Sequence, residues 1–225
     1  ALMNWVREDF APNSDALVIA LGSFVEGPID PNKFEWSNIT LGLSEVNNFK
    51  KLFIRDMDFA WWQTKFEGLE GRGPHVVANF IKEKVKESKA KRVMVMGASL
   101  GGYGAILFAC LCKLDLAVAI SPQTYLTEGR YIKYSLHEKY KDLNVNVEET
   151  DLAVILKKYG NNYSNSKYHV YFGKYNKGDS HYASRISRFP GVELFPLESD
   201  HHTVGGFMKN NKMLHNIILD FAKSN

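Results

Sequence analysis

Residues 97–101 read Gly97-Ala98-Ser99-Leu100-Gly101, and this pentapeptide decides the fold class. It follows an apolar run, 92–96, that predicts a buried strand, and it precedes a second apolar run, 102–109, that predicts a buried helix. A G-x-S-x-G sequence between a strand and a helix is typical of a nucleophile elbow, a tight turn that holds a serine above a helix N-terminus. Glycine suits both flanks, because a Cβ there would collide with the adjacent strand or helix.

Two other interpretations of the pentapeptide must be weighed. One is a glycine-rich turn without chemistry. The other is a dinucleotide-binding turn, which needs G-x-G-x-x-G after the strand and an acidic residue at the end of the next strand. Here the glycines are Gly97, Gly101, Gly102 and Gly104, and the nearest acid, Asp115, comes before the next strand. The spacing therefore argues against dinucleotide binding.

The composition is that of an ordinary globular protein. The chain has 225 residues, of which 45% are hydrophobic and 24% charged, enough for one large α/β domain with a proper core. The net charge of +3 implies no strongly anionic partner. The lysines of 82–92 predict the solvated face of one helix, so we expect no nucleic-acid partner.

Membrane and metal signals are also missing from the sequence. No apolar run reaches membrane-spanning length, and residues 1–4 lack the parts of a signal peptide, which favours a cytoplasmic protein unless a leader was removed earlier. Cys110 and Cys112 lie two apart on a predicted helix, so we expect small buried apolar groups and no disulfide. No spacing typical of metal ligands occurs, and we expect no metal and no cofactor. The oligomeric state is not indicated.

Strands alternate with helices along the whole chain, which predicts a mostly parallel sheet with helices on both faces. We expect a single α/β domain over 1–225 with about six strands, at 15–22, 51–55, 92–96, 116–120, 168–173 and 192–197. The predicted helices follow residue 74, follow Ser99, occupy 182–189 and begin again near 203. Residues 123–165 break the rhythm with two further helices, near 128–140 and 148–159, and we interpret this insertion as a small helical cap.

A serine nucleophile needs a base, usually histidine, and the histidine needs a third group that fixes its tautomer. In a parallel sheet all three must come from loops at the carboxyl ends of the strands. His201 and His202 follow the last strand, and we prefer His202 because it precedes the apolar residues that begin the next helix. His201 stays an alternative, because predicted boundaries slip by a few residues.

The acid is expected in the loop after the strand at 168–173. Asp179 is the carboxylate of that loop, although an aspartate there is also a favoured helix N-cap. Asp200 is a weaker candidate, because it adjoins the histidines and neighbouring side chains seldom reach each other well. For the oxyanion we expect the backbone N–H of Leu100 and a second N–H from the loop after the first strand, at Ser23 or Phe24.

With strand, elbow, acid and histidine in this order, the chain resembles the three-layer α/β-hydrolase fold, from Leu17 to Ala222. It looks like a trimmed version that lacks the first two, antiparallel strands. Further segments resemble little-studied bacterial α/β hydrolases, some thought to serve surface-polysaccharide metabolism. These segments are Phe34-Glu35-Trp36, Arg55-Asp56 with Trp61-Trp62, Ser99-Leu100-Gly101-Gly102-Tyr103, Ser121-Pro122-Gln123-Thr124 and His202-Thr203-Val204. The HGG oxyanion motif of common esterases is missing.

The resemblance implies a serine hydrolase that works through an acyl-enzyme. Ser99 would attack an ester carbonyl, His202 would carry the proton, and Asp179 would orient His202. The leading expectation is a carboxylic-ester hydrolase acting on a small-molecule or carbohydrate ester. The alternatives are an acyltransferase with the same triad and a non-catalytic scaffold used for binding. Candidate substrate-binding residues are Trp61, Trp62, Tyr103, Gln123, Tyr125 and His201, although core packing explains the tryptophans at least equally well.

Overall fold

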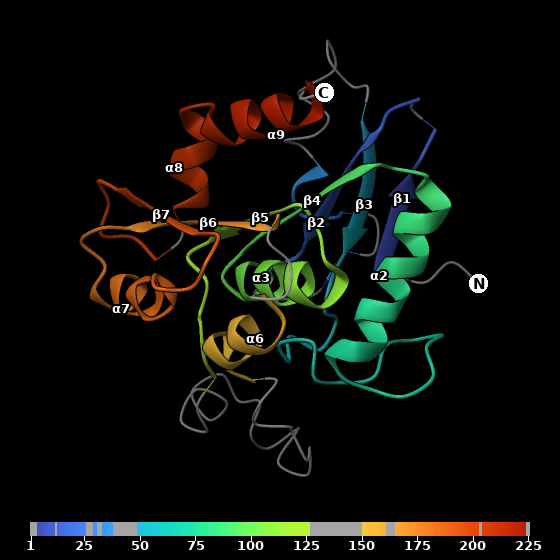
Figure 1. Ribbon diagram of the computed structural model, residues 1–225, viewed down its shortest axis with the longest axis horizontal. Helices are drawn as coiled ribbons and strands as arrows, with labels where there is room; N and C mark the ends of the chain where they lie inside the picture. The colour runs from blue at the N-terminus through green and yellow to red at the C-terminus, as the bar shows by residue number, and fades with distance from the viewer. Residues whose placement is uncertain are drawn as a thin grey trace.

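A seven-stranded sheet forms the centre of the described molecule (Figure 1). The computed structural model describes residues 4–11, 13–25, 29–30, 33–37, 49–126, 150–160, 165–202 and 204–223. The strand order is β1-β3-β2-β4-β5-β6-β7. All neighbouring strands are parallel except β1 and β3, which are antiparallel. The strands are β1 (Val6–Asp9), β2 (Ala16–Leu21), β3 (Lys50–Ile54), β4 (Arg92–Ala98), β5 (Leu116–Ile120), β6 (Lys167–Gly173) and β7 (Val192–Leu197).

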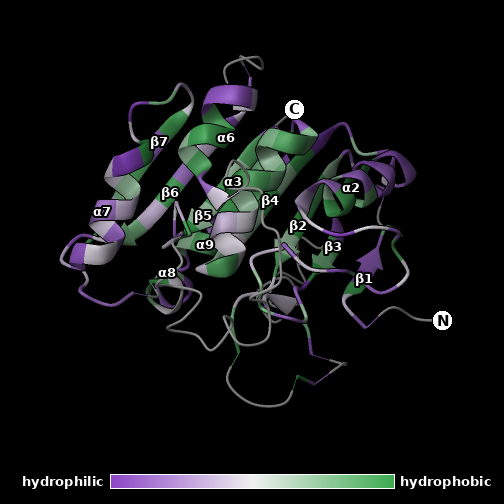
Figure 2. Ribbon diagram, turned by 90° about the horizontal axis from the view of Figure 1, so that it is seen from below, coloured by the Kyte–Doolittle hydropathy of each residue, from purple (hydrophilic) through white to green (hydrophobic). Residues whose placement is uncertain are grey.

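The six predicted strands are confirmed as β2 to β7, and the structure adds β1. The expectation that both antiparallel strands are lacking was therefore wrong, because β1 pairs antiparallel with β3, Val6 opposite Ile54 and Asp9 opposite Lys51. The sequence of β1, Val-Arg-Glu-Asp, has no apolar alternation, and most of the strand is exposed at the sheet edge. Figure 2 shows β1 in hydrophilic colours for this reason. Such an edge strand gives no periodicity signal.

Helices cover both faces of the sheet, as the sequence predicts (Figure 1). One face carries the helices whose buried side chains join those of Leu17, Ile19 and Val95, and the other face carries those that join Val18, Met94 and Met96. The alternation along β2 and β4 follows from the period of two in a strand. The first group is α2 (Pro74–Ser88), α3 (Leu100–Cys112), α6 (Leu152–Tyr159) and α7 (Lys177–Ile186), and the second is α8 (Gly205–Asn210) and α9 (Met213–Lys223).

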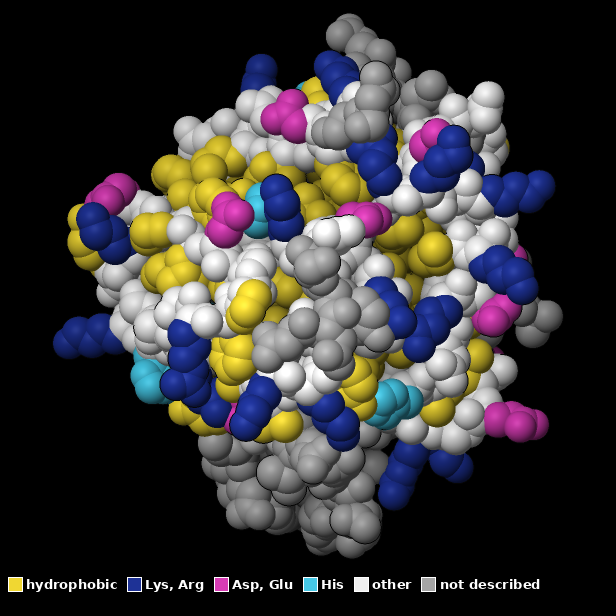
Figure 3. All heavy atoms as spheres, in the orientation of Figure 1, with side chains coloured by type: hydrophobic (Ala, Val, Ile, Leu, Met, Phe, Trp, Pro, Cys, Tyr) yellow, Lys and Arg dark blue, Asp and Glu magenta, His cyan; other side chains and the backbone are white. Residues whose placement is uncertain are grey.

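The helix after the elbow, α3, is the most deeply buried of these helices. Every residue from Leu100 to Leu111 is buried, because α3 lies between the sheet and the helices α2 and α6. A helix that is apolar on all sides is typical of such a central position. Cys110 and Cys112 are free thiols on α3, and burial raises the pKa of the Cys110 thiol to about 12. Figure 3 shows basic side chains spread over one face of the molecule with acidic ones between them.

The interpretation of 123–165 as a cap stays a prediction. The helix expected at 128–140 lies outside the described residues. The second expected helix is observed as α6, whose buried side chains Leu152, Ile155 and Leu156 join the core around α3. The C-terminal helical region is divided into α8 and α9 at Lys212, which has a φ of 57°. Within the described ranges no helix is long and apolar enough to span a bilayer.

Candidate active site

Ser99 occupies a strained turn between β4 and α3. Its φ of 50° and ψ of −112° lie outside the regions favoured by side-chain-bearing residues. Such a conformation costs on the order of 1–3 kcal/mol and persists only where surrounding contacts impose it. Ser99 N–H donates to the carbonyl of Ile120 at 2.8 Å, and Tyr103 N–H donates to the carbonyl of Ser99 at 2.9 Å. The turn therefore holds the serine oxygen at the carboxyl edge of the sheet.

Glycines allow α3 to approach the strands beneath it. A Cβ on Gly97 would lie 2.5 Å from the carbonyl carbon and oxygen of Gly101, and a Cβ on Gly101 would lie 2.7 Å from the carbonyl oxygen of Leu21. A Cβ on Gly102 would lie 2.8 Å from the carbonyl oxygen of Ile120. All of these contacts are with backbone atoms, which cannot move away as the end of a flexible side chain could. The two glycines of the G-x-S-x-G motif are thus required by packing, as the sequence pattern predicts.

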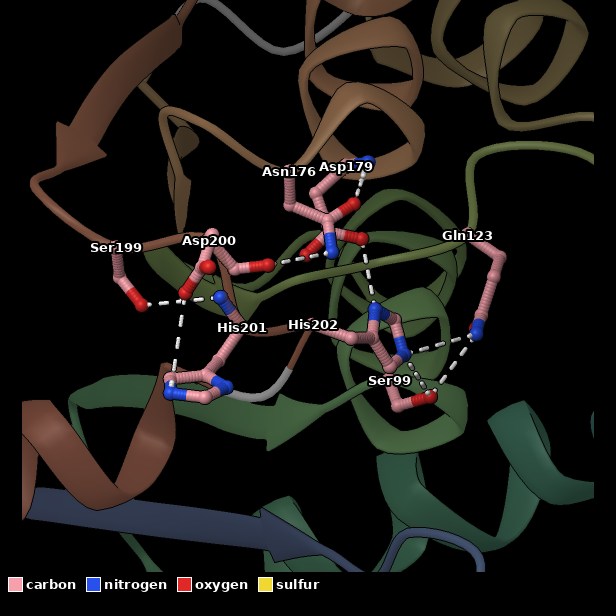
Figure 4. Close-up of polar contacts among 8 residues, drawn as sticks. All are labelled: Ser99, Gln123, Asn176, Asp179, Ser199, Asp200, His201 and His202. Carbon is pink, nitrogen blue, oxygen red and sulfur yellow. Dashed lines mark hydrogen bonds and ion pairs between the residues drawn. The ribbon is translucent and has the colours of Figure 1, made fainter.

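The structure brings together Ser99 from the turn before α3, Asp179 from the first turn of α7 and His202 from the loop after β7 (Figure 4). The Ser99 Oγ atom lies 3.1 Å from His202 Nε2, and His202 Nδ1 lies 2.7 Å from Asp179 Oδ1. Asp179 is buried, with 3% of its surface exposed, whereas 40% of the His202 side chain is exposed. A buried carboxylate on one ring nitrogen and an open hydroxyl on the other is the arrangement that general-base catalysis requires.

His201, the alternative base, points away from Ser99 in Figure 4. Its side chain is 85% exposed and lies 3.8 Å from Asp200 Oδ1. Asp200 is likewise directed to His201 rather than to His202. The two adjacent side chains thus face different ways, that of His202 toward Ser99 Oγ and that of His201 toward Asp200.

Asn176 joins the start of α7, which carries Asp179, to the loop that carries His202. Its Oδ1 accepts the N–H of Asp179 at 3.0 Å as the N-cap of α7, and its Nδ2 donates to the carbonyl of Asp200 at 3.1 Å. Asp179 is therefore a residue of the first helical turn and not the cap. The sequence signal was available, because an asparagine three residues before an aspartate at a helix start is a capping pattern.

Gln123 also reaches the nucleophile. It follows β5, and its Nε2 donates to Ser99 Oγ at 2.9 Å and lies 3.4 Å from His202 Nε2. The site residues Ser99, Gln123, Asp179 and His202 thus follow four neighbouring strands, β4 to β7, at their carboxyl ends. This is where ligands are expected in a parallel sheet.

The predicted oxyanion donors differ in their present contacts. Leu100 is the first residue of α3, so its N–H has no carbonyl of a preceding turn to bond. The N–H of Ser23 donates instead to Glu35 Oε2 at 2.5 Å. Burial raises the pKa of the Glu35 carboxyl, and the hydrogen bonds from Ser23 oppose that shift. Ser23 can therefore serve an oxyanion only if Glu35 releases it, and Phe24 is the other predicted donor of this loop.

A cavity of about 330 Å³ lies beside the same loop. Gly22, Ser23, Glu35 and Arg55 are among its lining residues, and Ser99 is not. The cavity is thus lined by the loop that holds the predicted oxyanion donor Ser23.

Three predicted substrate-binding residues are core residues instead. Trp61, Trp62 and Tyr103 expose 4%, 0% and 0% of their surfaces, so the prediction that they contact substrate was wrong and the core-packing interpretation of the tryptophans holds. The Trp62 ring stacks on Phe66 with a centroid distance of 6.0 Å, and a Cβ on Gly104 would lie 2.5 Å from its Nε1. These contacts place Trp62 beneath α3.

Tyr125 packs against α7. Its ring lies 5.4 Å from that of Tyr182 and is covered by the Arg185 guanidinium, 4.7 Å from the ring centroid. No described contact joins Tyr125 to Ser99, His202 or Asp179. A role in substrate binding for Tyr125 and for the exposed His201 stays a prediction.

Comparisons with known proteins identify the fold by structure rather than by sequence. No family model matches the chain, and no curated protein matches it. Over 94% of this chain and 90% of the other, the structure aligns with the capsule O-acetyltransferase of Neisseria meningitidis serogroup A, at 14% identity and a TM-score of 0.68. FphF, a fluorophosphonate-binding serine hydrolase of Staphylococcus aureus, aligns over 93% of this chain and 85% of its own, at 16% identity and a TM-score of 0.55. An esterase of Pyrococcus furiosus aligns over 94% and 83%, at 15% identity and a TM-score of 0.56.

Proposed function

Because this chain has the α/β-hydrolase fold, we propose that it is a serine hydrolase that cleaves carboxylic esters through an acyl-enzyme. The observation that carries the proposal is the hydrogen-bonded series from Ser99 Oγ to His202 Nε2 at 3.1 Å and from His202 Nδ1 to Asp179 Oδ1 at 2.7 Å. The strained backbone of Ser99 supports it, because strain of this kind accumulates at functional sites. A glycine-rich turn without catalytic function would not account for a histidine hydrogen-bonded to both the serine and a buried carboxylate.

In the first step Ser99 Oγ attacks the ester carbonyl carbon while His202 Nε2 takes the hydroxyl proton. The buried Asp179 carboxylate stabilises the imidazolium that forms and keeps Nδ1 as a donor. The tetrahedral intermediate then collapses, the carbon–oxygen bond to the alcohol breaks, and His202 returns the proton to the departing alcohol oxygen. An acyl group remains on Ser99.

The oxyanion of this intermediate is expected to accept the N–H of Leu100. The positive end of the α3 dipole adds to that stabilisation, because Leu100 begins the helix. The second donor is the N–H of Phe24 or, after Glu35 has moved, of Ser23. Removing one such donor costs about 3 kcal/mol of transition-state stabilisation in known enzymes.

In the second step a water molecule attacks the acyl carbon. His202 accepts the proton of the water and passes it to Ser99 Oγ as the acid leaves. The names of two structural neighbours, a fluorophosphonate-binding serine hydrolase and an esterase, support this reaction class.

A second candidate is acyl transfer, in which the hydroxyl of an alcohol or sugar replaces water. The observation that favours it is a difference in structural likeness. Three structures of the capsule O-acetyltransferase align with TM-scores of 0.67 to 0.68, whereas five neighbours of other description align with TM-scores of 0.55 to 0.59. The name of that neighbour also supports a carbohydrate as the alcohol. A carbohydrate ester is therefore the substrate class that we propose for either reaction.

A panel of esters tests these proposals. Purified protein is incubated with acetyl, longer acyl and carbohydrate esters, with and without an added acceptor alcohol, and the Ser99→Ala variant is the control. Acid release that depends on Ser99 supports hydrolysis, and ester exchange onto the acceptor in excess of acid release supports transfer. Turnover that is unchanged in Ser99→Ala, or absent with every ester, would sink the proposal.

A further inference from the structure

Gln123 has a backbone that is fixed on both sides. Ser121, two residues before it, has a φ of 45° and donates its N–H to the carbonyl of Tyr171 at 2.7 Å. Thr124, the next residue, donates its hydroxyl to the carbonyl of Tyr182 at 3.0 Å and accepts the N–H of Leu152 at 2.9 Å. The segment is thus tied to β6, α7 and α6, so the direction of the Gln123 side chain is set by the fold.

The amide of Gln123 forms a triangle with the two reacting atoms of the site (Figure 4). Its Nε2 lies 2.9 Å from Ser99 Oγ and 3.4 Å from His202 Nε2, and those two atoms are 3.1 Å apart. Only 3% of Gln123 is exposed. A buried amide within reach of both the nucleophile and its base can hydrogen-bond to an atom that reacts between them.

The orientation of this amide follows from its surroundings. Gln123 Oε1 is buried and has no hydrogen-bond partner among the described residues. A flip of the amide would bury the NH₂ group in that place, and two donors would then go unpaired instead of one acceptor. The N–H therefore faces the site. As a donor to Ser99 Oγ it also leaves the serine proton directed at His202.

The amide lies on the side of Ser99 where the alcohol oxygen must be. His202 exchanges its proton with the leaving alcohol and later with the attacking water or acceptor, so that oxygen has to lie close to Nε2. The oxyanion must face the N–H of Leu100 instead. An amide nitrogen 3.4 Å from His202 Nε2 therefore suits the alcohol oxygen.

We propose that Gln123 is the positioning residue for the alcohol oxygen: it donates to Ser99 Oγ in the free enzyme and to the leaving or attacking oxygen during the reaction. The proposal rests on the proposed function. After acylation Oγ is an ester oxygen, which accepts hydrogen bonds poorly, and the N–H becomes available for the leaving or attacking oxygen. Gln123 transfers no proton; the proton still moves between His202 and the alcohol oxygen.

The test compares two esters of one acid, ethyl acetate and 4-nitrophenyl acetate, in the Gln123→Met variant. Methionine has a similar length and no N–H. Nitrophenolate leaves with little help, whereas ethoxide needs a donor, so kcat/KM should fall about tenfold more for the ethyl ester than for the nitrophenyl ester. Gln63→Met is the matched control, because Gln63 is also a buried glutamine and donates to the carbonyl of Trp61 at 3.1 Å, away from the nucleophile.

Labelling of Ser99 by a fluorophosphonate separates the two ways of failing. If the wild type and Gln123→Met are both labelled at Ser99 and the variant loses the same factor with both esters, Gln123 has only a structural role and the inference is overturned. A differential as large in Gln63→Met would overturn it as well. If Ser99 of the wild type is neither labelled nor acylated, the proposed function is wrong, and the inference about Gln123, which rests on it, is wrong as well.

Discussion

At the scale of single residues, the consecutive histidines His201 and His202 have different surroundings. His202 is turned toward Ser99 Oγ, and His201 is turned out to solvent beside Asp200. Sequence alone favoured His202 for its place before an apolar run but left His201 open, because a shift of one residue in a loop exchanges the two sides. The contacts of Asn176 and the backbone of the loop fix that register, and neither can be deduced from periodicity.

The two histidines give the first prediction. His202→Ala should lower ester turnover by at least 10²-fold, because Ser99 loses its general base, whereas His201→Ala should stay within about threefold of the wild type. Steady-state kinetics with one activated ester checks both. An inactive His201→Ala beside an active His202→Ala would show that the base is assigned to the wrong residue.

Asn176 gives the second prediction, since its two contacts can be separated. Asn176→Asp keeps an oxygen that can cap the N–H of Asp179 but loses the donor to the carbonyl of Asp200. Because asparagine and aspartate cap a helix about equally well, we expect stability within about 0.5 kcal/mol of the wild type, and a lower kcat with little change in KM. Asn176→Ala should also lose about 1 kcal/mol of stability, the usual cost of a missing N-cap. Chemical denaturation and kinetics measure the pair, and equal kcat values in Asn176→Asp and the wild type would contradict the link between the loops.

Glycine packing gives the third prediction. A methyl group on Gly101 would lie 2.7 Å from the carbonyl oxygen of Leu21, whereas a methyl group on Gly206 in α8 meets nothing within 4 Å. We therefore expect Gly101→Ala to lower the free energy of unfolding by about 1–3 kcal/mol. Gly206→Ala should leave it unchanged or raise it by up to about 1 kcal/mol, since alanine favours a helix. Similar denaturation midpoints for the two variants would contradict the packing described for the elbow.

At the scale of elements, the segment 56–62 shows what the sequence does not reveal. The carboxylate of Asp56 accepts the N–H of Ala60 at 2.8 Å, of Trp62 at 2.8 Å and of Asp58 at 3.2 Å. Phe59, Trp61 and Trp62 all have positive φ, and the fully buried Asp56 satisfies the backbone of this unusual turn. The tryptophans were open to two interpretations because aromatic residues serve both cores and sugar-binding clefts, and only the turn around Asp56 directs them inward.

Asp56 gives the fourth prediction, on pH. Burial raises the pKa of its carboxyl to about 6, against the opposing hydrogen bonds from Trp62, Asp58 and Ala60. The folded state therefore holds this proton more tightly than the unfolded state does. The resulting stability is complete below about pH 4 and is lost as the pH rises through about 6.

The matched variant for this prediction is Asp56→Asn, which cannot titrate. The free energy of unfolding of the wild type minus that of Asp56→Asn should fall by about 2 kcal/mol between pH 4 and pH 6, by about 3 kcal/mol between pH 3 and pH 7, and be level above pH 7. Urea denaturation at a series of pH values measures the difference. A difference that is constant or grows over this range would contradict the protonation behaviour described for Asp56.

At the scale of the whole molecule, strand order builds the candidate site. Residues far apart in sequence meet because β4, β5, β6 and β7 are neighbours whose carboxyl ends share one edge. The alternation of strands and helices predicted that edge, and with it the meeting of Ser99, Asp179 and His202. It did not predict β1, which is polar, or the engagement of Ser23 by Glu35, which depends on a side-chain contact between segments that no local pattern encodes.

The central claim, that Ser99 is a nucleophile activated by His202, is tested most directly by fluorophosphonate labelling with mass spectrometry of the modified peptide. The account predicts a single phosphonyl group on Ser99 in the wild type, none in Ser99→Ala, and labelling at least about tenfold slower in His202→Ala than in the wild type. A wild-type protein that stays unlabelled, or a label that persists in Ser99→Ala, would contradict the claim.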